Sequence, residues 1–361
     1  EPLTMNAPDI RARFAQARAA GKRHKDAAES IGVSEGAALA AHAGAHGAPL
    51  RAVPLRGPWL ELLQALQACG PLLALTRNAS TVHEKTGVYE KLSATGPIGL
   101  ALGEAIDLRL FFHHWHAGFA VTEAAASPGA PAALSLQFFD AHGLAVHKVF
   151  CREATGRAAF EAVMQRFIDP TLAPVFQARP AALAPQADSA IDAPGLLDAW
   201  AAMQDTHEFF DLLKRFGAER RQSFRLAEGR FTRRAAKTAL RQLLQEAAFD
   251  GAPIMVFVGS PGCIQIHTGP VVRIEPLEMQ GAHWLNVLDP GFNLHLCEDA
   301  IDQVWVVEKP TSDGIVTSVE AFDRTGELMA MFFGARKPGE PERQDWRAIV
   351  RKAAPLAALA A

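Results

Sequence analysis

The chain has 361 residues, of which 49% are apolar and 21% are charged, and its formal net charge is −3. This length suggests two domains with a large core, and the absence of a basic block argues against general nucleic-acid binding. No run of 18 apolar residues and no N-terminal signal-like segment occurs, so neither membrane spanning nor export is expected. Four widely spaced cysteines without a CxxC motif favour a reduced, cytoplasmic compartment.

The first half begins with helical patterns and continues with strands. Residues 8–45 are rich in Ala, Arg and Glu at spacings that suit short helices, and 58–69 indicate an amphipathic helix with a proline near its start. From residue 72 onward, short apolar runs are divided by Gly and Asp turns, which is typical of strands. Residues 155–170 indicate a closing helix.

An Ala- and Pro-rich segment, 178–195, is poor in large apolar residues and is interpreted as a linker. Beyond it the order of the first half recurs. The pattern predicts helices at 196–216, 218–227 and 234–248, strands from residue 253, and a last helix near 341–353. We therefore predict an N-terminal repeat at 1–177 and a C-terminal repeat at 196–361.

A repeated segment supports this duplication. Residues 135–150 (SLQFFDAHGLAVHKVF) align without gaps with 318–333 (SVEAFDRTGELMAMFF), and DLRLFF at 107–112 lies over NLHLCE at 293–298. AHG and RTG, at 141–143 and 324–326, fit hairpin turns. Helices followed by antiparallel strands and a closing helix predict an α+β fold with two homologous halves, whose sheets we expect to stack centrally.

Several common motifs are missing from the sequence. It contains no GxGxxG after a strand, no P-loop, no GxSxG and no HExxH. The glycines of GSPG at 259–262 do follow a strand, but the chain continues at once as another strand, CIQIH. We interpret this segment as a hairpin rather than as a nucleotide-binding loop.

The most unusual local segment is DTHEFFDLLKRFGAERRQSFRLA at 205–227. On a helix, His207 would share a face with Phe210, Asp211 and Lys214, and a basic cluster follows it. Spacing alone favours a capped helix start with a solvated basic face over a ligand site.

Arg109 is the second candidate, because it falls over His295 in the repeat and alternates with leucines on the opposite strand face. An arginine in this position needs a partner or water. An ion pair between sheets and a functional role both remain open.

Five segments together resemble the bacterial hemin-degrading factor family, also called cytoplasmic hemin transport proteins. They are TRNASTVHEKTGVYEKL, DLRLFFHHW, PIMVFVGSPGCIQIHTGP, WLNVLDPGFNLHL and VVEKPTSDGIVTS. The resemblance spans about residues 10–353. It implies two similar halves with large stacked antiparallel sheets, and a haem bound in the C-terminal half.

The resemblance also implies a role for individual residues. His207 would bind the iron, Arg109 of the N-terminal half would cover the opposite haem face, and Phe111 would line the access path. Arg220, Lys309 and Arg336 would hold the propionates, as suits a rim of cations. The chain departs from the family pattern at Ala79 and Ser80, and at Phe333, where some members have a tyrosine near the haem edge.

The function implied is that of a cytoplasmic haem-binding protein of iron acquisition that degrades haem with an external reductant. Arg109 would then stabilise negative charge on a ligand of the iron. The alternative is a non-catalytic chaperone that delivers intact haem to a separate haem oxygenase. Expected partners are haem and either a haem-uptake transporter or an oxygenase, and the chain is expected to be a monomer or a homodimer.

Overall fold

The computed structural model describes residues 4–356, which form two compact units. Unit 1 comprises the chain up to Arg77, His83–Pro180 and Gly259–Gln265, and unit 2 comprises Asn78–Val82, Ala181–Val258 and the chain from Ile266 onward. None of the helices in the described part combines the length and hydropathy that a membrane-spanning helix needs. The ranges assigned from the sequence to the repeats and the linker stay predictions, since the units are defined by compactness alone.

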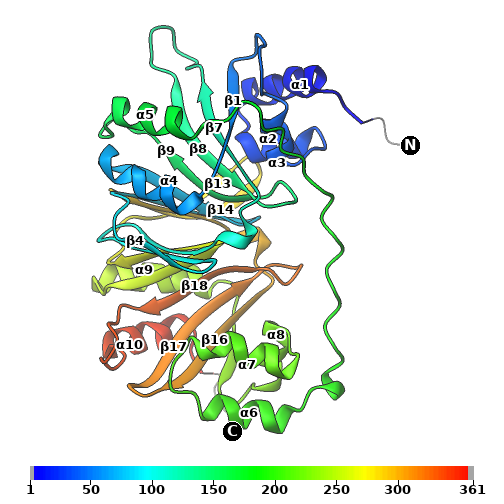
Figure 1. The fold of residues 1–361 in the computed structure, drawn as a ribbon. Coiled ribbons are helices and arrows are strands. Elements are labelled where there is room, and N and C mark those ends of the chain that lie inside the picture. The colour runs from blue at the N-terminus through cyan, green and yellow to red at the C-terminus, as the bar shows by residue number, and fades with distance from the viewer. Residues whose placement is uncertain (1–3, 357–361) are drawn as a thin grey trace. The chain divides into compact units, whose positions relative to one another are not determined.

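The first half of the chain forms a series of elements that ends in a helix (Figure 1). In order they are α1 (Ala7–Ala19), α2 (His24–Ser30), α3 (Glu35–Ala40), β1 (Leu50–Leu55), α4 (Trp59–Ala65), η1 (Leu66–Cys69), β2 (Leu72–Arg77), β3 (Thr81–Gly87), β4 (Leu92–Thr95), β5 (Ile98–Leu102), β6 (Asp107–Phe111), η2 (Phe112–His114), β7 (Ala117–Glu123), β8 (Ala133–Phe139), β9 (Ala145–Phe150) and α5 (Arg157–Phe167).

The second half forms a matching series. It consists of η3 (Asp188–Ala190), α6 (Ala193–Ala201), α7 (Glu208–Phe216), α8 (Arg220–Leu226), β10 (Thr232–Ala235), α9 (Ala239–Asp250), β11 (Ile254–Gly259), β12 (Cys263–Gly269), β13 (Ile274–Met279), β14 (Ala282–Asp289), β15 (Phe292–Cys297), η4 (Glu298–Ala300), β16 (Gln303–Thr311), β17 (Gly314–Phe322), β18 (Leu328–Gly334) and α10 (Gln344–Ala353).

Both series follow one plan, which confirms the predicted α+β fold of two homologous halves. Three helices precede a strand and a helix, and eight strands interrupted by a 3₁₀ turn precede the closing helix. The expectation that all helices come first was wrong, because β1 and β10 interrupt them. The helix predicted at 234–248 begins only at Ala239, since residues 232–235 pair with β16 as a strand.

The strands of each unit pair in corresponding orders. In unit 1 the order β1-β7-β8-β9-β2 matches β10-β16-β17-β18-β11 in unit 2, and β4-β5-β6 matches β13-β14-β15. The pairs within these groups are antiparallel. The predicted stacking of the sheets stays a prediction.

The two duplicated hairpins have equivalent hydrogen bonds in their turns. In β8–β9 the Oδ1 atom of Asp140 accepts backbone N–H bonds from His142 and Leu144, both at 2.9 Å. In β17–β18 the Oδ1 atom of Asp323 accepts the equivalent bonds from Thr325 and Glu327, at 2.9 and 3.0 Å. Each turn contains a glycine at positive φ, as the sequence predicts.

Helices pack on both faces of each five-strand group, over only part of one face. Helices α1–α3 pack on the apolar side chains of one face in unit 1, and α6–α8 do the same in unit 2. The opposite faces pack on α4 and α5 in unit 1 and on α9 and α10 in unit 2. Burial of these faces supplies the two cores.

Candidate functional site

His207 lies immediately before α7, as its N-cap residue, and its side chain is 87% exposed. Its Nδ1 atom lies 2.7 Å from Oδ1 of Asp205, and its backbone N–H donates to the same oxygen at 2.9 Å. Among residues 4–356, the Nε2 atom of His207 makes no hydrogen bond. This nitrogen is therefore available to bind a ligand from outside.

The continuous helix predicted at 196–216 is in fact two helices. The first, α6, ends at Ala201, and α7 begins seven residues later. The backbone N–H of Gln204 donates to Oε2 of Glu208 at 3.2 Å, while its carbonyl accepts a bond from the N–H of Ser312 at 2.9 Å. The break therefore places His207 at a helix start, tied to the turn that follows β16.

Two cations predicted from the sequence meet on one buried carboxylate. Arg220, the first residue of α8, donates to Oε1 of Glu320 at 2.8 Å, and Nζ of Lys309 lies 3.5 Å from Oε2. Both cations also lie over the ring of Phe209, at 5.2 and 4.6 Å from its centroid. Because Phe209 is two residues from His207, these contacts bring both cations to the start of α7.

Burial and neighbouring charges shift the pKa values of Lys309 and Glu320 in opposite directions. Burial lowers the pKa of Lys309 to about 8, although Glu320 partly offsets this. Burial would raise the pKa of Glu320, but Arg220 and Lys309 hold it at about 2. At neutral pH the cluster thus contains an ionised carboxylate between two cations and keeps a net positive charge.

Arg336 lies in the same region and has its own carboxylate partner. Its Nη1 atom donates to Oδ2 of Asp313 and to the carbonyl of Glu340, both at 3.0 Å. Its positive charge also contributes to lowering the pKa of Asp205, after the larger effect of the hydrogen bonds from His207. The structure thus brings together the four C-terminal residues singled out from the sequence.

A half-buried apolar surface adjoins these charges. The strand register places Met255 opposite Phe333, and Phe257 opposite Met331 and hence beside Glu320. The Phe257 and Phe333 ring centroids are 5.1 Å apart, and all four apolar side chains remain partly exposed. We call Met255, Phe257, Met331 and Phe333 the apolar floor.

Sequence reasoning missed most of this floor and the carboxylates beneath the cations. Consecutive apolar residues in PIMVFVG at 253–259 make both faces of this strand apolar. The second face therefore also needs a group that covers it. Glu320 is the lone acidic residue of the strand SVEAF, and a charge in such a strand indicates a buried partner. Neither signal identifies the partner, which is distant in sequence.

In unit 1, Arg109 lies on β6 with its side chain 31% exposed. Its Nη1 atom donates to Oδ1 of Asp107 at 2.6 Å and to the carbonyl of Leu108 at 3.2 Å. The side chains of Leu108 and Leu110 are fully buried on the other face, as predicted. The ion pair is thus within one strand rather than between sheets, and Phe111 is half-buried on the Arg109 face.

The N-terminal half has a counterpart of the site with its charges reversed. The aligned serines, Ser135 and Ser318, pair with Val121 and Val307. Two residues further along these strands lie Glu123 and Lys309, so Glu123 is at the position equivalent to Lys309. Glu35 begins α3 as Arg220 begins α8, and it pairs with Lys148, whose own counterpart is Met331. Carboxylates thus replace both cations of the C-terminal cluster.

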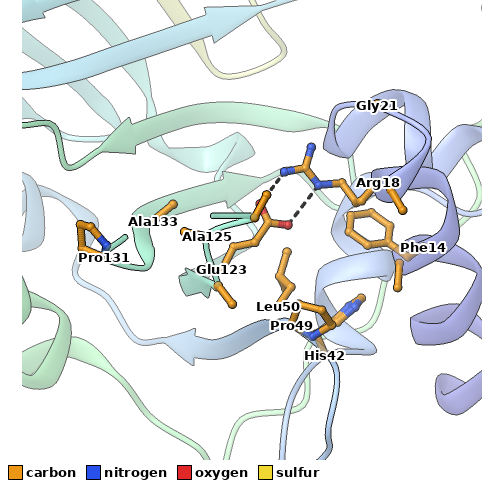
Figure 2. A pocket seen from close by; sticks show the side chains of 14 residues that line it. Phe14, Arg18, Gly21, His42, Pro49, Leu50, Glu123, Ala125, Pro131 and Ala133 are labelled. Carbon is orange, nitrogen blue, oxygen red and sulfur yellow. Dashed lines mark hydrogen bonds and ion pairs between the residues drawn. The ribbon is translucent and has the colours of Figure 1, made fainter. Parts of the chain in front are cut away.

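Glu123 already contacts two basic side chains of its own half. Arg18 donates to both of its carboxylate oxygens, at 3.0 and 2.5 Å, and Nε2 of His24 lies 3.3 Å away. Burial would raise the pKa of Glu123, but His24 and Arg18 hold it at about 2. Figure 2 shows this pair at the wall of a mainly apolar cavity of about 480 Å³, next to Phe14 and Leu50.

Comparison with known proteins identifies both halves. A family model described as "Haemin-degrading HemS.ChuX domain" matches residues 32–167 and again 217–353. The chain is 38% identical over 334 residues to the hemin transport protein HmuS of Yersinia pestis, covering 92% of this chain and 93% of that protein.

Solved structures agree with this assignment. Holo-PhuS, a heme-binding protein from Pseudomonas aeruginosa, superposes with a TM-score of 0.90 at 44% identity, over 98% of this chain and 100% of that one. The heme-degrading enzyme ChuS of Escherichia coli O157:H7 superposes with a TM-score of 0.86 at 35% identity, over 97% and 100%. The chain therefore belongs to the haemin-degrading HemS/ChuX family and contains two copies of its domain.

Proposed function

We propose that this chain binds haem in its C-terminal half, with Nε2 of His207 as the iron ligand. The observation that carries the proposal is an exposed imidazole whose Nδ1 is already engaged, beside a cationic cluster and an apolar floor. Haem is an apolar plate with two carboxylates and a metal that accepts imidazole, so each part has a matching group.

The cations differ in what they offer to the haem carboxylates. Arg220 and Arg336 have side chains that are 24% and 20% exposed, so each can turn an N–H toward an incoming carboxylate. The ammonium of Lys309 is almost fully buried, and it contributes positive potential while it neutralises Glu320. Burying the porphyrin on the apolar floor supplies most of the affinity, at roughly 25 cal/mol per Å² of apolar area.

The relatives support haem as the ligand. One is named a hemin transport protein, one a heme-binding protein and one a heme-degrading enzyme. We infer that this chain degrades haem with an external reductant, which would supply the electrons. Arg109 would stabilise negative charge that develops during the reaction, and Phe111 would line the access path. The alternative, a carrier that delivers intact haem to an oxygenase, uses the same C-terminal site.

We also propose that the protein works in the cytoplasm, where it receives haem from an uptake system. All four cysteines are free thiols, and Cys69 and Cys263 are buried. Free thiols without a disulfide framework suit a reducing compartment.

Substitution of the ligand tests haem binding. We expect His207→Ala to shift the Soret band and to weaken the affinity for ferric haem by more than about 100-fold, the upper end of what loss of an outer-shell partner costs. The matched control is His283→Ala, which removes another exposed histidine paired with an aspartate in unit 2, at 3.0 Å from Asp299. Equal spectra and affinities for the two variants would mean that another residue binds the iron.

A second experiment separates degradation from carriage. The haem complex is given ascorbate in the presence of catalase, which removes free peroxide, and the tetrapyrrole products are identified. A defined ring-opened product supports degradation, and Arg109→Ala is then expected to slow its formation by 10²–10³-fold, the cost typical of losing one such donor. Haem that survives unless an oxygenase is added would identify a carrier.

A further inference from the structure

One carboxylate oxygen holds His207 at two points. Oδ1 of Asp205 accepts the backbone N–H at 2.9 Å and the ring Nδ1 at 2.7 Å. This oxygen accepts the backbone N–H, so the same carboxylate oxygen also faces Nδ1 as an acceptor. Nδ1 must therefore carry the proton, which leaves the lone pair of the imidazole on Nε2.

The aspartate itself is held in place by the chain around it. Its carbonyl accepts the N–H of Glu208 at 3.1 Å, and the carbonyl of Thr206 accepts the N–H of Phe209 at 3.2 Å, as α7 begins. Phe209 is buried beneath the two cations, and Gln204 is bonded to Ser312. The turn that carries Asp205 is thus fixed on both sides, although the carboxylate is 59% exposed.

We propose that Asp205 is the positioning residue for the iron ligand and sets how strongly His207 donates electrons to the iron. The proposal rests on the proposed function. A carboxylate on Nδ1–H fixes the tautomer and orientation of a metal-binding imidazole and raises its basicity, and loss of such a partner costs about 10–100-fold in metal affinity. A more basic imidazole favours ferric over ferrous iron, so Asp205 would also lower the reduction potential of the haem.

The first test needs no haem. Long-range ¹H–¹⁵N spectra of the haem-free protein report which ring nitrogen of His207 carries the proton. We expect the Nδ1–H form in the wild type and in Asp211→Asn, which removes an exposed acid in the first turn of α7. In Asp205→Ala we expect a mixture of tautomers, and an unchanged Nδ1–H signal would overturn the proposal.

The second test reads the iron–imidazole bond in the ferrous haem complex by resonance Raman spectroscopy. We expect the iron–histidine stretching band to move to lower frequency in Asp205→Ala, to move part of the way in Asp205→Asn, and to stay in place in Asp211→Asn. Asparagine keeps an acceptor for both hydrogen bonds but lacks the charge. This variant therefore separates an effect on electron donation by His207 from an effect on how α7 begins. The ferric affinity should fall about 10–100-fold in Asp205→Ala.

The outcomes separate this inference from the proposed function. If His207→Ala retains the iron–histidine band, the ligand is another residue and the proposed function itself is wrong. If His207→Ala loses the band while both Asp205 variants keep it at the wild-type frequency, only the role of Asp205 is refuted. A loss of affinity in Asp205→Ala without any frequency shift would likewise refute it, because Asp205 would then serve only to begin α7.

Discussion

At the scale of single residues, the cationic cluster depends on one carboxylate. Glu320 is fully buried and binds Arg220 at 2.8 Å, Lys309 at 3.5 Å and the hydroxyl of Ser318 at 2.8 Å. Two like charges this close repel each other strongly in a buried setting, and a counter-charge between them offsets this repulsion. Glu320 therefore makes the positive site compatible with a folded protein.

Replacement of this carboxylate should be costly. In Glu320→Gln the two cations lose their shared counter-charge, and we expect the free energy of unfolding to fall by about 3–5 kcal/mol, as when one partner of a buried ion pair is removed. Urea unfolding at pH 7 measures this change. The control Glu278→Gln, at an exposed site, should stay within about 0.5 kcal/mol of the wild type, and equal values for both variants would contradict the role of Glu320.

Glu320 also makes the free energy of unfolding depend on pH in acid. Its folded pKa of about 2 lies below the ordinary 4.5, so the folded state binds this proton less readily than the unfolded state. The stabilisation is complete above pH 4.5 and is lost as the pH falls from 4.5 toward 2. The gap between wild type and Glu320→Gln in urea unfolding should therefore narrow from pH 5 to pH 3, and a constant gap would contradict this account.

Much of the site could be predicted from the sequence only through family resemblance. The resemblance identified His207, Arg220, Lys309 and Arg336, which the structure gathers in one region, whereas local spacing favoured a solvated helix start. Local patterns cannot reveal Glu320 as a partner, because it lies 100 residues from Arg220 in the chain. Ion pairs of this kind depend on tertiary structure, which periodicity does not encode.

At the scale of elements, the two hairpin turns show how far the duplication preserves structure. Asp140 and Asp323 each use one oxygen to hold two backbone N–H groups, so that a glycine can follow at positive φ. In addition, Asp323 accepts the hydroxyl of Thr325 at 2.7 Å. The Asp323 turn fixes the register of β17, which carries Glu320, against β18, which carries Met331 and Phe333 of the apolar floor.

The turn aspartate should therefore contribute to stability. In Asp323→Ala two backbone donors lose their acceptor, and we expect a loss of about 1–3 kcal/mol, measured by thermal or urea unfolding. Asp323→Asn should retain most of the stability, because an amide oxygen still accepts both bonds. If the two variants were destabilised equally, the charge rather than the turn geometry would be responsible.

Elements with strong periodicity were predicted well, and short ones were not. The long apolar runs of β8 and β17 were recognised from composition, and the final helix matched the structure closely. In contrast, β10 reads TRRA and has no apolar alternation. It is a strand because it pairs with β16, so only the partner strand determines its conformation.

At the scale of the whole molecule, duplication has preserved the fold while the charges have diverged. Lys309 and Arg220 in one half correspond to Glu123 and Glu35 in the other. A haem carboxylate placed at the N-terminal position would meet Glu123 and Glu35, and the cations beside them, Arg18 and Lys148, are already bound to these two carboxylates, which disfavours its binding.

We therefore expect one high-affinity haem per chain. His24 begins α2 much as His207 precedes α7, but its Nε2 atom already contacts Glu123, which Arg18 also binds. Titration of the haem-free protein with ferric haem, followed at the Soret band, should saturate at one equivalent in the wild type and in His24→Ala. Saturation at two equivalents, with one lost in His24→Ala, would show that the N-terminal half kept the ligand function despite its reversed charges.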